Sequence, residues 1–157
     1  MTVPVALSLG SNLGDRRSHL SWAIGQLSSH VRDLRASSFI ETEPVDVPDT
    51  QPPYLNAAVV GHTALDPRAL MNVLLEIEKS RGRERLTPRA ARTLDLDLIF
   101  YGDQMIHEPG LVVPHPHFRD RAFVLEPLME IAGDWVDPVT GKNVAILLGE
   151  FFGRSGE

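Results

Sequence analysis

The segment from Thr93 to Tyr101 sets aspartates between leucines, and this alternation constrains the fold more than any other part of the chain. Successive side chains of a β-strand point to opposite faces of a sheet. Asp95 and Asp97 therefore share one face of a predicted strand. The opposite face receives the leucines Leu94, Leu96 and Leu98. The pattern predicts a sheet that packs against an apolar layer on one side and carries two carboxylates on the other.

Apolar periodicity predicts the elements in the order strand, helix, two strands, helix, strand, and then a mixed tail. The strands are expected at 3–9, 37–42, 54–63 and 93–101, and the two main helices near 16–29 and between Asp66 and Gly82. Shorter helices are expected at 123–132 and 144–152, with loops at 43–53 and over most of 102–122. This order is typical of an α+β fold with a ferredoxin-like βαββαβ core, an antiparallel sheet and helices. We expect one domain, 1–157.

Composition excludes several classes of protein. The chain has 157 residues, no cysteine and a formal net charge of −6. Without cysteine, a disulfide scaffold, a thiolate zinc site and a cysteine nucleophile are excluded. No stretch approaches the ~18 apolar residues of a membrane span, and the first residues lack a basic secretory signal. We therefore expect a cytoplasmic protein that binds neither membrane nor nucleic acid.

Five arginines lie within twelve residues that contain a single acid, Glu84. They are Arg81, Arg83, Arg85, Arg89 and Arg92. Guanidinium groups make planar, two-pronged contacts with phosphate, so a local cluster in an acidic chain favours a site for a small polyanion. A solvated charged loop would show the same spacing, and the spacing alone does not separate the two interpretations.

The carboxylate pair also has two interpretations. Two ionised carboxylates at i and i+2 of a strand, roughly 6.5–7 Å apart at Cα, repel each other unless a cation lies between them. Mg²⁺ commonly takes one or two carboxylates together with phosphate oxygens of a substrate. An acidic, solvated strand face is the alternative. The arginine cluster just upstream favours the metal site, because cations, carboxylates and phosphates together balance charge.

Two other motifs give only weak evidence for a metal or ligand site. The histidines 107, 115 and 117 have neither cysteine partners nor helical spacing, so a zinc site is not expected. His115 is better interpreted as a donor to a phosphate or hydroxyl. The segment Gly10–Asp15 follows a strand and opens a helix but lacks a Walker A or dinucleotide pattern. We interpret it as a structural turn with a helix cap at Asp15, and only weakly as a ligand contact.

Five blocks, in order, resemble the 6-hydroxymethyl-7,8-dihydropterin pyrophosphokinase family. They are Ser8–Asp15, Pro53–Val59, Gly82–Arg85, Arg92–Leu98, and Val113–Pro116 with Arg121–Leu125. The resemblance spans about residues 3 to 150. It implies transfer of diphosphate from ATP to the pterin hydroxymethyl group, with release of AMP and with two Mg²⁺ ions. We expect the chain to act as a monomer.

The resemblance also implies roles for individual residues. Asp95 and Asp97 match the metal ligands, and Arg83 and Arg92 match catalytic residues. The residues matched to ATP binding are Arg85, Arg89, Arg92, Leu98, His115 and Arg121. The residues matched to pterin binding are Thr42, Val45, Tyr54, Asn56 and Phe123, with the two aromatic rings enclosing the pterin. Leu75, Ala91, Gly110 and Val112 depart from residues that some members carry.

Two alternatives to the enzyme are a ferredoxin-like RNA-binding module and a pterin-binding relative without catalysis. Sheets of this fold can stack bases on aromatic residues. An aromatic content of 6% and a net charge of −6 argue against RNA binding. Retention of Asp95, Asp97, Arg92 and His115 argues against a relative that has lost its chemistry.

Overall fold

The central strand of the sheet is β1 (Val3–Ser11), which pairs antiparallel with β4 (Tyr54–Thr63) on one side and β5 (Asp95–Tyr101) on the other. The computed structural model describes residues 1–42, 53–81 and 93–155. Two shorter strands, β2 (Arg32–Ala36) and β3 (Ile40–Thr42), also pair antiparallel with β4. In the order β2-β4-β1-β5, each βαβ unit connects two strands that have one other strand between them. This is the ferredoxin-like arrangement expected from the sequence, within an α+β single-domain fold.

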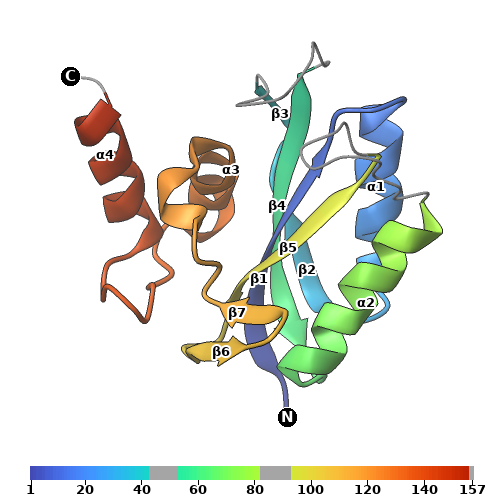
Figure 1. Cartoon of the computed structure of the whole chain (residues 1–157), viewed down its shortest axis with the longest axis horizontal. Coiled ribbons are helices and arrows are strands. Elements are labelled where there is room, and N and C mark those ends of the chain that lie inside the picture. The colour runs from blue at the N-terminus through green and yellow to red at the C-terminus, as the bar shows by residue number, and fades with distance from the viewer. Residues whose placement is uncertain (43–52, 82–92, 156–157) are drawn as a thin grey trace.

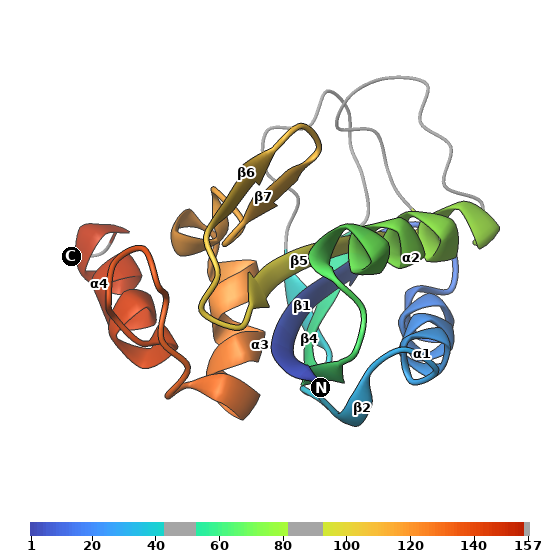
Figure 2. The same ribbon diagram turned by 90° about the horizontal axis from the view of Figure 1, so that it is seen from below.

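Helices cover both faces of this sheet, as Figures 1 and 2 show. Helices α1 (Arg16–Leu27) and α2 (Pro67–Ser80) lie on one face. Helix α3 (Ala122–Ala132) packs on the other face, and α4 (Val144–Ser155) packs outside α3. Within the described residues, no helix is long and apolar enough to cross a membrane.

The two main helices begin where local chemistry predicts. The Asp15 carboxylate accepts a hydrogen bond from the Ser18 N–H at 3.2 Å, and the Asp66 carboxylate accepts one from the Ala69 N–H at 2.7 Å. These side chains satisfy backbone donors that have no partner within the helix. Pro67 follows Asp66 at a position where its missing N–H costs nothing. The predicted apolar stripe of α2, formed by Leu70, Leu74 and Ile77, is buried against the sheet.

The alternation of β5 separates two hydrophobic clusters. Leu94, Leu96 and Leu98 belong to the cluster beneath α1 and α2. Ile99 and Phe100 belong to the cluster beneath α3. The register with β1 shifts between Ala6 and Leu7, so Leu98 faces Leu7 while Phe100 faces Ala6. This bulge turns two successive apolar residues toward α3, and it leaves the Asp95–Leu98 part of the strand in strict alternation.

The structure corrects four expectations. Strand β1 continues through Gly10 and Ser11, which were predicted to form a turn, because both pair across to β4. Strand β2 was not predicted, since most of its side chains are exposed and show no alternation. Only Ile40–Thr42 of the predicted strand 37–42 is a strand. The expected loop after residue 101 contains the hairpin of β6 (Ile106–Glu108) and β7 (Leu111–Val113) and a short helical turn, η1 (Phe118–Asp120).

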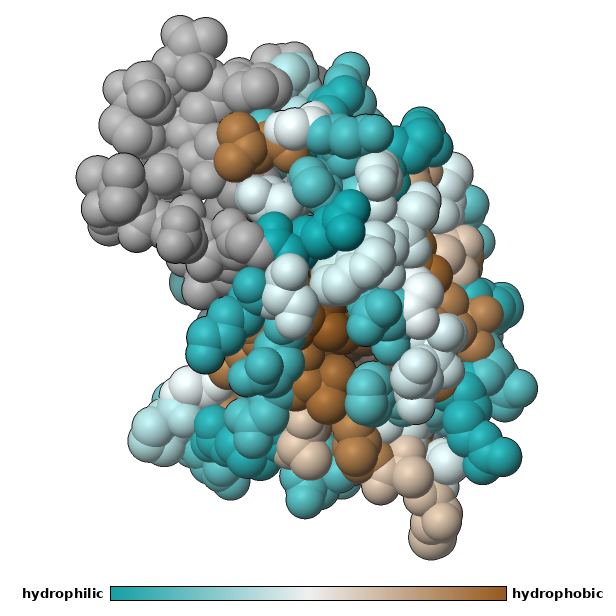
Figure 3. Space-filling model, turned by 90° about the vertical axis from the view of Figure 1, so that its right-hand side faces the viewer, coloured by the Kyte–Doolittle hydropathy of each residue, from teal (hydrophilic) through white to brown (hydrophobic). Residues whose placement is uncertain are grey.

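The outer surface of the α1 and α2 layer is mainly hydrophilic, with apolar residues showing in several separate places (Figure 3). This fits helices that bury one stripe and solvate the rest. Leu75, on the solvent side of α2, is 49% exposed.

Candidate active site

Three strands bring an amide, a glycine and a carboxylate into one row across the sheet. Gly10 of β1 lies opposite Asn56 of β4 and opposite Asp95 of β5. In the next row, Ser8 lies between Ala58 and Asp97. Because Ala58 packs in the cluster beneath α3, the side chains of this row face the α3 side. Residues distant in sequence therefore form one polar surface where β1 ends and β4 and β5 begin (Figure 1).

The predicted carboxylate pair lies on this face, as strand alternation predicts. Asp95 and Asp97 are partly buried, whereas the intervening Leu96 is buried on the opposite side. Nε2 of His115 lies 3.9 Å from Oδ1 of Asp97. The chain after β7 thus brings His115 to the strand that carries the carboxylates.

His115 is held as a neutral donor. Its Nδ1 accepts a hydrogen bond from the His117 N–H at 3.1 Å, which leaves the proton on Nε2, the atom nearer Asp97. Burial, reinforced by the positive charges of Arg121 and His117, lowers the pKa of His115 to about 4. At neutral pH the imidazole is therefore uncharged, and it can donate from Nε2 to an oxygen of a ligand.

Three of the predicted pterin-binding residues, Thr42, Tyr54 and Asn56, lie together at this end of the sheet. Asn56 is buried, and its Nδ2 donates to Oγ1 of Thr42 at 2.6 Å. Thr42 pairs with Tyr54 across the β3–β4 ladder. Phe123, in the first turn of α3, has the Arg121 guanidinium 5.7 Å from its ring centroid. The hydrogen bond to Thr42 fixes the orientation of the Asn56 amide, so its remaining donor and its carbonyl are held in place for a ligand.

Gly10 is a site residue that the sequence reasoning treated as a turn. A Cβ atom at this position would lie 3.2 Å from Oδ1 of Asn56 and 3.5 Å from a ring carbon of Tyr54. A side chain at this position would press on the Asn56 amide, so glycine leaves the amide and the Tyr54 ring undisturbed. A glycine inside a strand often marks a close approach of a ligand or another chain, and that signal was available in the sequence.

The remaining predicted site residues fall into two groups. The side chain of Leu98 is buried beneath α1 and α2, so any ATP contact by this residue would have to come from its backbone. The others lie outside the described residues: Val45, Arg83, Arg85, Arg89 and Arg92.

The donor set fits magnesium. Within residues 1–42, 53–81 and 93–155, no group of three or more His, Cys, Asp or Glu side chains could hold a metal ion. Asp95 and Asp97 supply two hard oxygen ligands on one face, beside a neutral histidine. Mg²⁺ is usually held by one or two carboxylates and completes its coordination with water and substrate phosphates. These residues thus suit a metal that arrives with a phosphate ligand.

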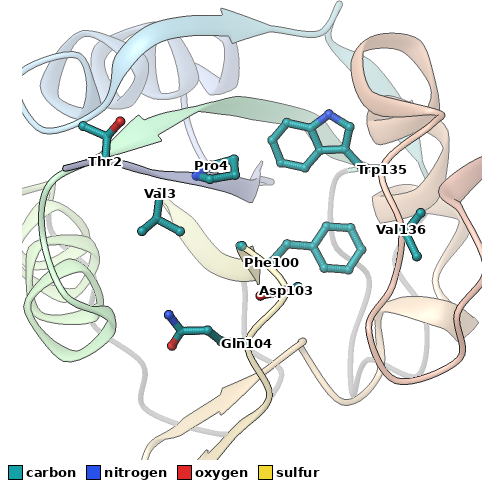
Figure 4. Close-up of a pocket in the computed structure, with 9 residues that line it drawn as sticks. Thr2, Val3, Pro4, Phe100, Asp103, Gln104, Trp135 and Val136 are labelled. Carbon is teal, nitrogen blue, oxygen red and sulfur yellow. The ribbon is translucent and has the colours of Figure 1, made fainter.

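A separate cavity of about 630 Å³ lies at the far end of the sheet, near the start of β1. Pro4, Phe100, Asp103 and Trp135 are among the residues that line it (Figure 4). None of its described lining residues is basic, and none was predicted to bind substrate. Its described lining therefore offers no counter-charge to a phosphate.

Comparison with known proteins identifies the family. Residues 6–133 match the model of the 7,8-dihydro-6-hydroxymethylpterin-pyrophosphokinase family. A 2-amino-4-hydroxy-6-hydroxymethyldihydropteridine pyrophosphokinase of Synechocystis sp. is 42% identical over 144 residues, which cover 90% of this chain and 73% of that protein. The Bacillus subtilis protein of the same name is 41% identical over 80% of this chain and 75% of its own length.

Some relatives are longer proteins. A folate synthesis bifunctional protein of Arabidopsis thaliana is 44% identical over 82% of this chain, which spans only 27% of that protein. Among solved structures, a Plasmodium falciparum HPPK-DHPS triple mutant matches the fold with a TM-score of 0.79 at 17% identity, covering 100% of this chain and 46% of that one. The match over residues 6–133, together with these identities, shows that the chain belongs to the 7,8-dihydro-6-hydroxymethylpterin-pyrophosphokinase family, the pyrophosphokinases of folate biosynthesis.

Proposed function

We propose that this chain transfers diphosphate from ATP to the hydroxymethyl group of 6-hydroxymethyl-7,8-dihydropterin and releases AMP. The row of Asn56, Gly10 and Asp95 is the observation that carries the proposal. It sets an oriented amide and an acidic pair on one face of the sheet, on either side of a glycine that adds no side chain between them. A ring bound at the amide would present its substituent toward the carboxylates, where a metal-bound triphosphate would lie.

Asp95 and Asp97 are the proposed ligands of two Mg²⁺ ions, shared with the phosphates of ATP. Bound magnesium would neutralise charge on the triphosphate and polarise its oxygens. The protein's own part is to position both substrates and stabilise charge, as in other phosphoryl transfers. His115 would donate from Nε2 to a phosphate oxygen, and Arg121 would add a positive charge on the same side.

The loop arginines complete the proposed ATP site. Arg83 and Arg92 are proposed to stabilise the charge that develops during transfer, and Arg85 and Arg89 to bind the outer phosphates. Their residue type supports this, because guanidinium groups bind phosphate through two parallel hydrogen bonds. Leu98 is proposed to contribute a backbone contact to ATP.

The pterin would lie between the rings of Tyr54 and Phe123. Asn56 would pair with its polar edge, since one amide can donate and accept at the same time. Thr42 holds that amide and, with Val45, is proposed to supply further contacts to the ring. This part of the site accounts for selectivity, whereas the carboxylates account for reactivity.

The proposed functional unit is one domain, 1–157, acting as a monomer in the cytoplasm. Some plant relatives are mitochondrial, so the compartment varies within the family.

The test is to mix the protein with ATP, Mg²⁺ and the dihydropterin and to measure AMP. AMP should appear only when all three are present, and Asp97→Asn should abolish it while pterin binding in calorimetry is kept. Pterin binding without AMP in the wild type would instead favour a binding protein without catalysis. Retention of a single-stranded RNA oligonucleotide, without pterin binding, would favour the RNA-binding alternative.

A further inference from the structure

Arg16 connects two segments that adjoin the proposed pterin site. Its Nη1 donates to the Pro53 carbonyl at 2.7 Å, and its Nη2 lies 2.7 Å from Oε2 of Glu41. Glu41 immediately precedes Thr42, and Pro53 immediately precedes Tyr54. The Arg16 guanidinium therefore binds the residue before Thr42 and the residue before Tyr54. Both Thr42 and Tyr54 are proposed to contact the pterin ring.

The position of Arg16 is not explained by its own helix. Arg16 is the first residue of α1, and the first turn of this helix contains no acidic residue. Free backbone N–H groups make a helix N-terminus partly positive, so an arginine there opposes the helix dipole. Its tertiary contacts, rather than helix stability, account for a cation at this place.

The ladder that Arg16 contacts is short. Strand β3 has three residues and, within the described part of the chain, pairs with β4 alone; its last residue, Thr42, lies opposite Tyr54, the first residue of β4. The ends of short ladders open easily because few hydrogen bonds hold them. Arg16 reaches this end of the ladder from the start of α1.

The chemistry of the contact requires a guanidinium. A planar fork can place one nitrogen on a carbonyl oxygen and another on a carboxylate at the same time, whereas an ammonium is a single point charge on a flexible stem. The side chain of Arg16 is 27% exposed and that of Glu41 is 55% exposed. A pair so accessible to water adds little to global stability, so its main consequence is the local geometry that it fixes.

We infer that Arg16 is a positioning residue for pterin recognition. It does not touch the substrate. By tying Glu41 and Pro53 to the start of α1, it fixes Thr42 and Tyr54, and Thr42 in turn orients the Asn56 amide. This inference rests on the proposed function, because it assigns Arg16 to the pterin side of that site and leaves the phosphate side unaffected.

The test compares steady-state kinetics of the wild type and Arg16→Ala. The KM for the dihydropterin should rise about fivefold to tenfold, because a partly exposed charge-assisted contact is lost. The kcat and the KM for ATP should stay within about twofold, because Asp95, Asp97 and His115 lie outside the contact.

Arg16→Lys should recover part of the loss. Glu41→Ala should weaken pterin binding less, and the Arg16→Ala/Glu41→Ala double variant should not be worse than Arg16→Ala.

Arg68→Ala is a matched control. Arg68 lies in the first turn of α2, and its Nη2 contacts Oε1 of Glu108 at 3.1 Å and the Pro109 carbonyl at 3.0 Å. This variant loses the same kind of contact at the other end of the sheet, so its KM for the pterin should match that of the wild type.

The possible outcomes distinguish failure of the proposed function from failure of the positioning role of Arg16. A wild type that neither binds the pterin nor forms AMP overturns the proposed function. A wild type that works, with an unchanged pterin KM in Arg16→Ala, overturns the positioning role alone. Equal losses for pterin and ATP, or an equal loss in Arg68→Ala, would show a general structural effect and also overturn it.

Discussion

Leu96 and Asp97 are neighbours in β5, yet their side chains belong to two different environments. Leu96 packs beneath α1 and α2 among the leucines of the larger apolar cluster. Asp97 faces the α3 side, near His115 and in line with Ser8 of β1. One face of the strand thus contributes to folding and the other to chemistry. The comparison implies that substitutions on the two faces should affect different properties, and four experiments test this.

The largest effect is expected on the carboxylate face. Asp97→Ala or Asp95→Ala should lower kcat about 1000-fold or more, because the proposed metal ligands and their charge stabilisation are lost. The free energy of unfolding should change by less than about 1 kcal/mol, since both side chains are only partly buried. AMP formation over a range of Mg²⁺ concentrations and urea unfolding measure the two quantities.

Asp103→Ala is the control, because it removes the same charge from an exposed position beyond β5. It should leave kcat unchanged. Either carboxylate variant with activity within tenfold of the wild type would contradict the metal assignment.

Substitutions on the opposite face of β5 should change the stability of the protein. Leu96→Ala should lower the free energy of unfolding by about 2–5 kcal/mol, as large-to-small changes in cores do. Protein that remains folded should still bind ATP analogue and pterin, because the backbone of β5 and both carboxylates are kept. Urea unfolding and calorimetry measure these properties, with Leu75→Ala on the exposed side of α2 as the control. Lost ligand binding with unchanged stability would contradict the division between the faces.

Asn56 lies on the same polar face as Asp95 and Asp97, but it is proposed to bind the pterin rather than the metal. Asn56→Ala should weaken pterin binding by about 1–3 kcal/mol, since ring donors and acceptors would lose their partner. ATP-analogue affinity should barely change. Calorimetry with each ligand tests this against Asn72→Ala, an exposed amide on α2. Equal losses for both ligands would show that Asn56 supports the fold instead.

The smallest effect is expected at Gly10. In Gly10→Ala the new methyl group would lie 3.2 Å from Oδ1 of Asn56, so the amide must shift by a few tenths of an ångström. Pterin affinity should fall about twofold to fivefold through the displaced hydrogen bond, while stability stays equal or rises because alanine restricts the unfolded chain. Gly149→Ala in α4, with no atom within 4 Å of the added carbon, is the control. Wild-type pterin affinity in Gly10→Ala would remove Gly10 from the site.

Predictions from sequence succeeded where one residue pattern had one physical cause. The alternation in β5, the apolar stripe of α2 and the caps at Asp15 and Asp66 each depend on local geometry, and all are present. The predictions failed where pairing with a distant strand decided the secondary structure. Strand β2 has no alternation of its own and exists because β4 offers it a partner. The hairpin of β6 and β7 likewise forms from residues that proline placement assigned to loops.

The same division holds at the site. The sequence by itself determined that Asp95 and Asp97 share a face, and its blocks indicated the family, because strand periodicity and residue identity are local properties. Only the tertiary structure decided that Gly10 lies between Asn56 and Asp95, that His115 is neutral beside Asp97, and that Arg16 joins Glu41 to Pro53. These relations depend on strand register and burial, which arise when segments far apart in the chain pack together and are not encoded by any one segment.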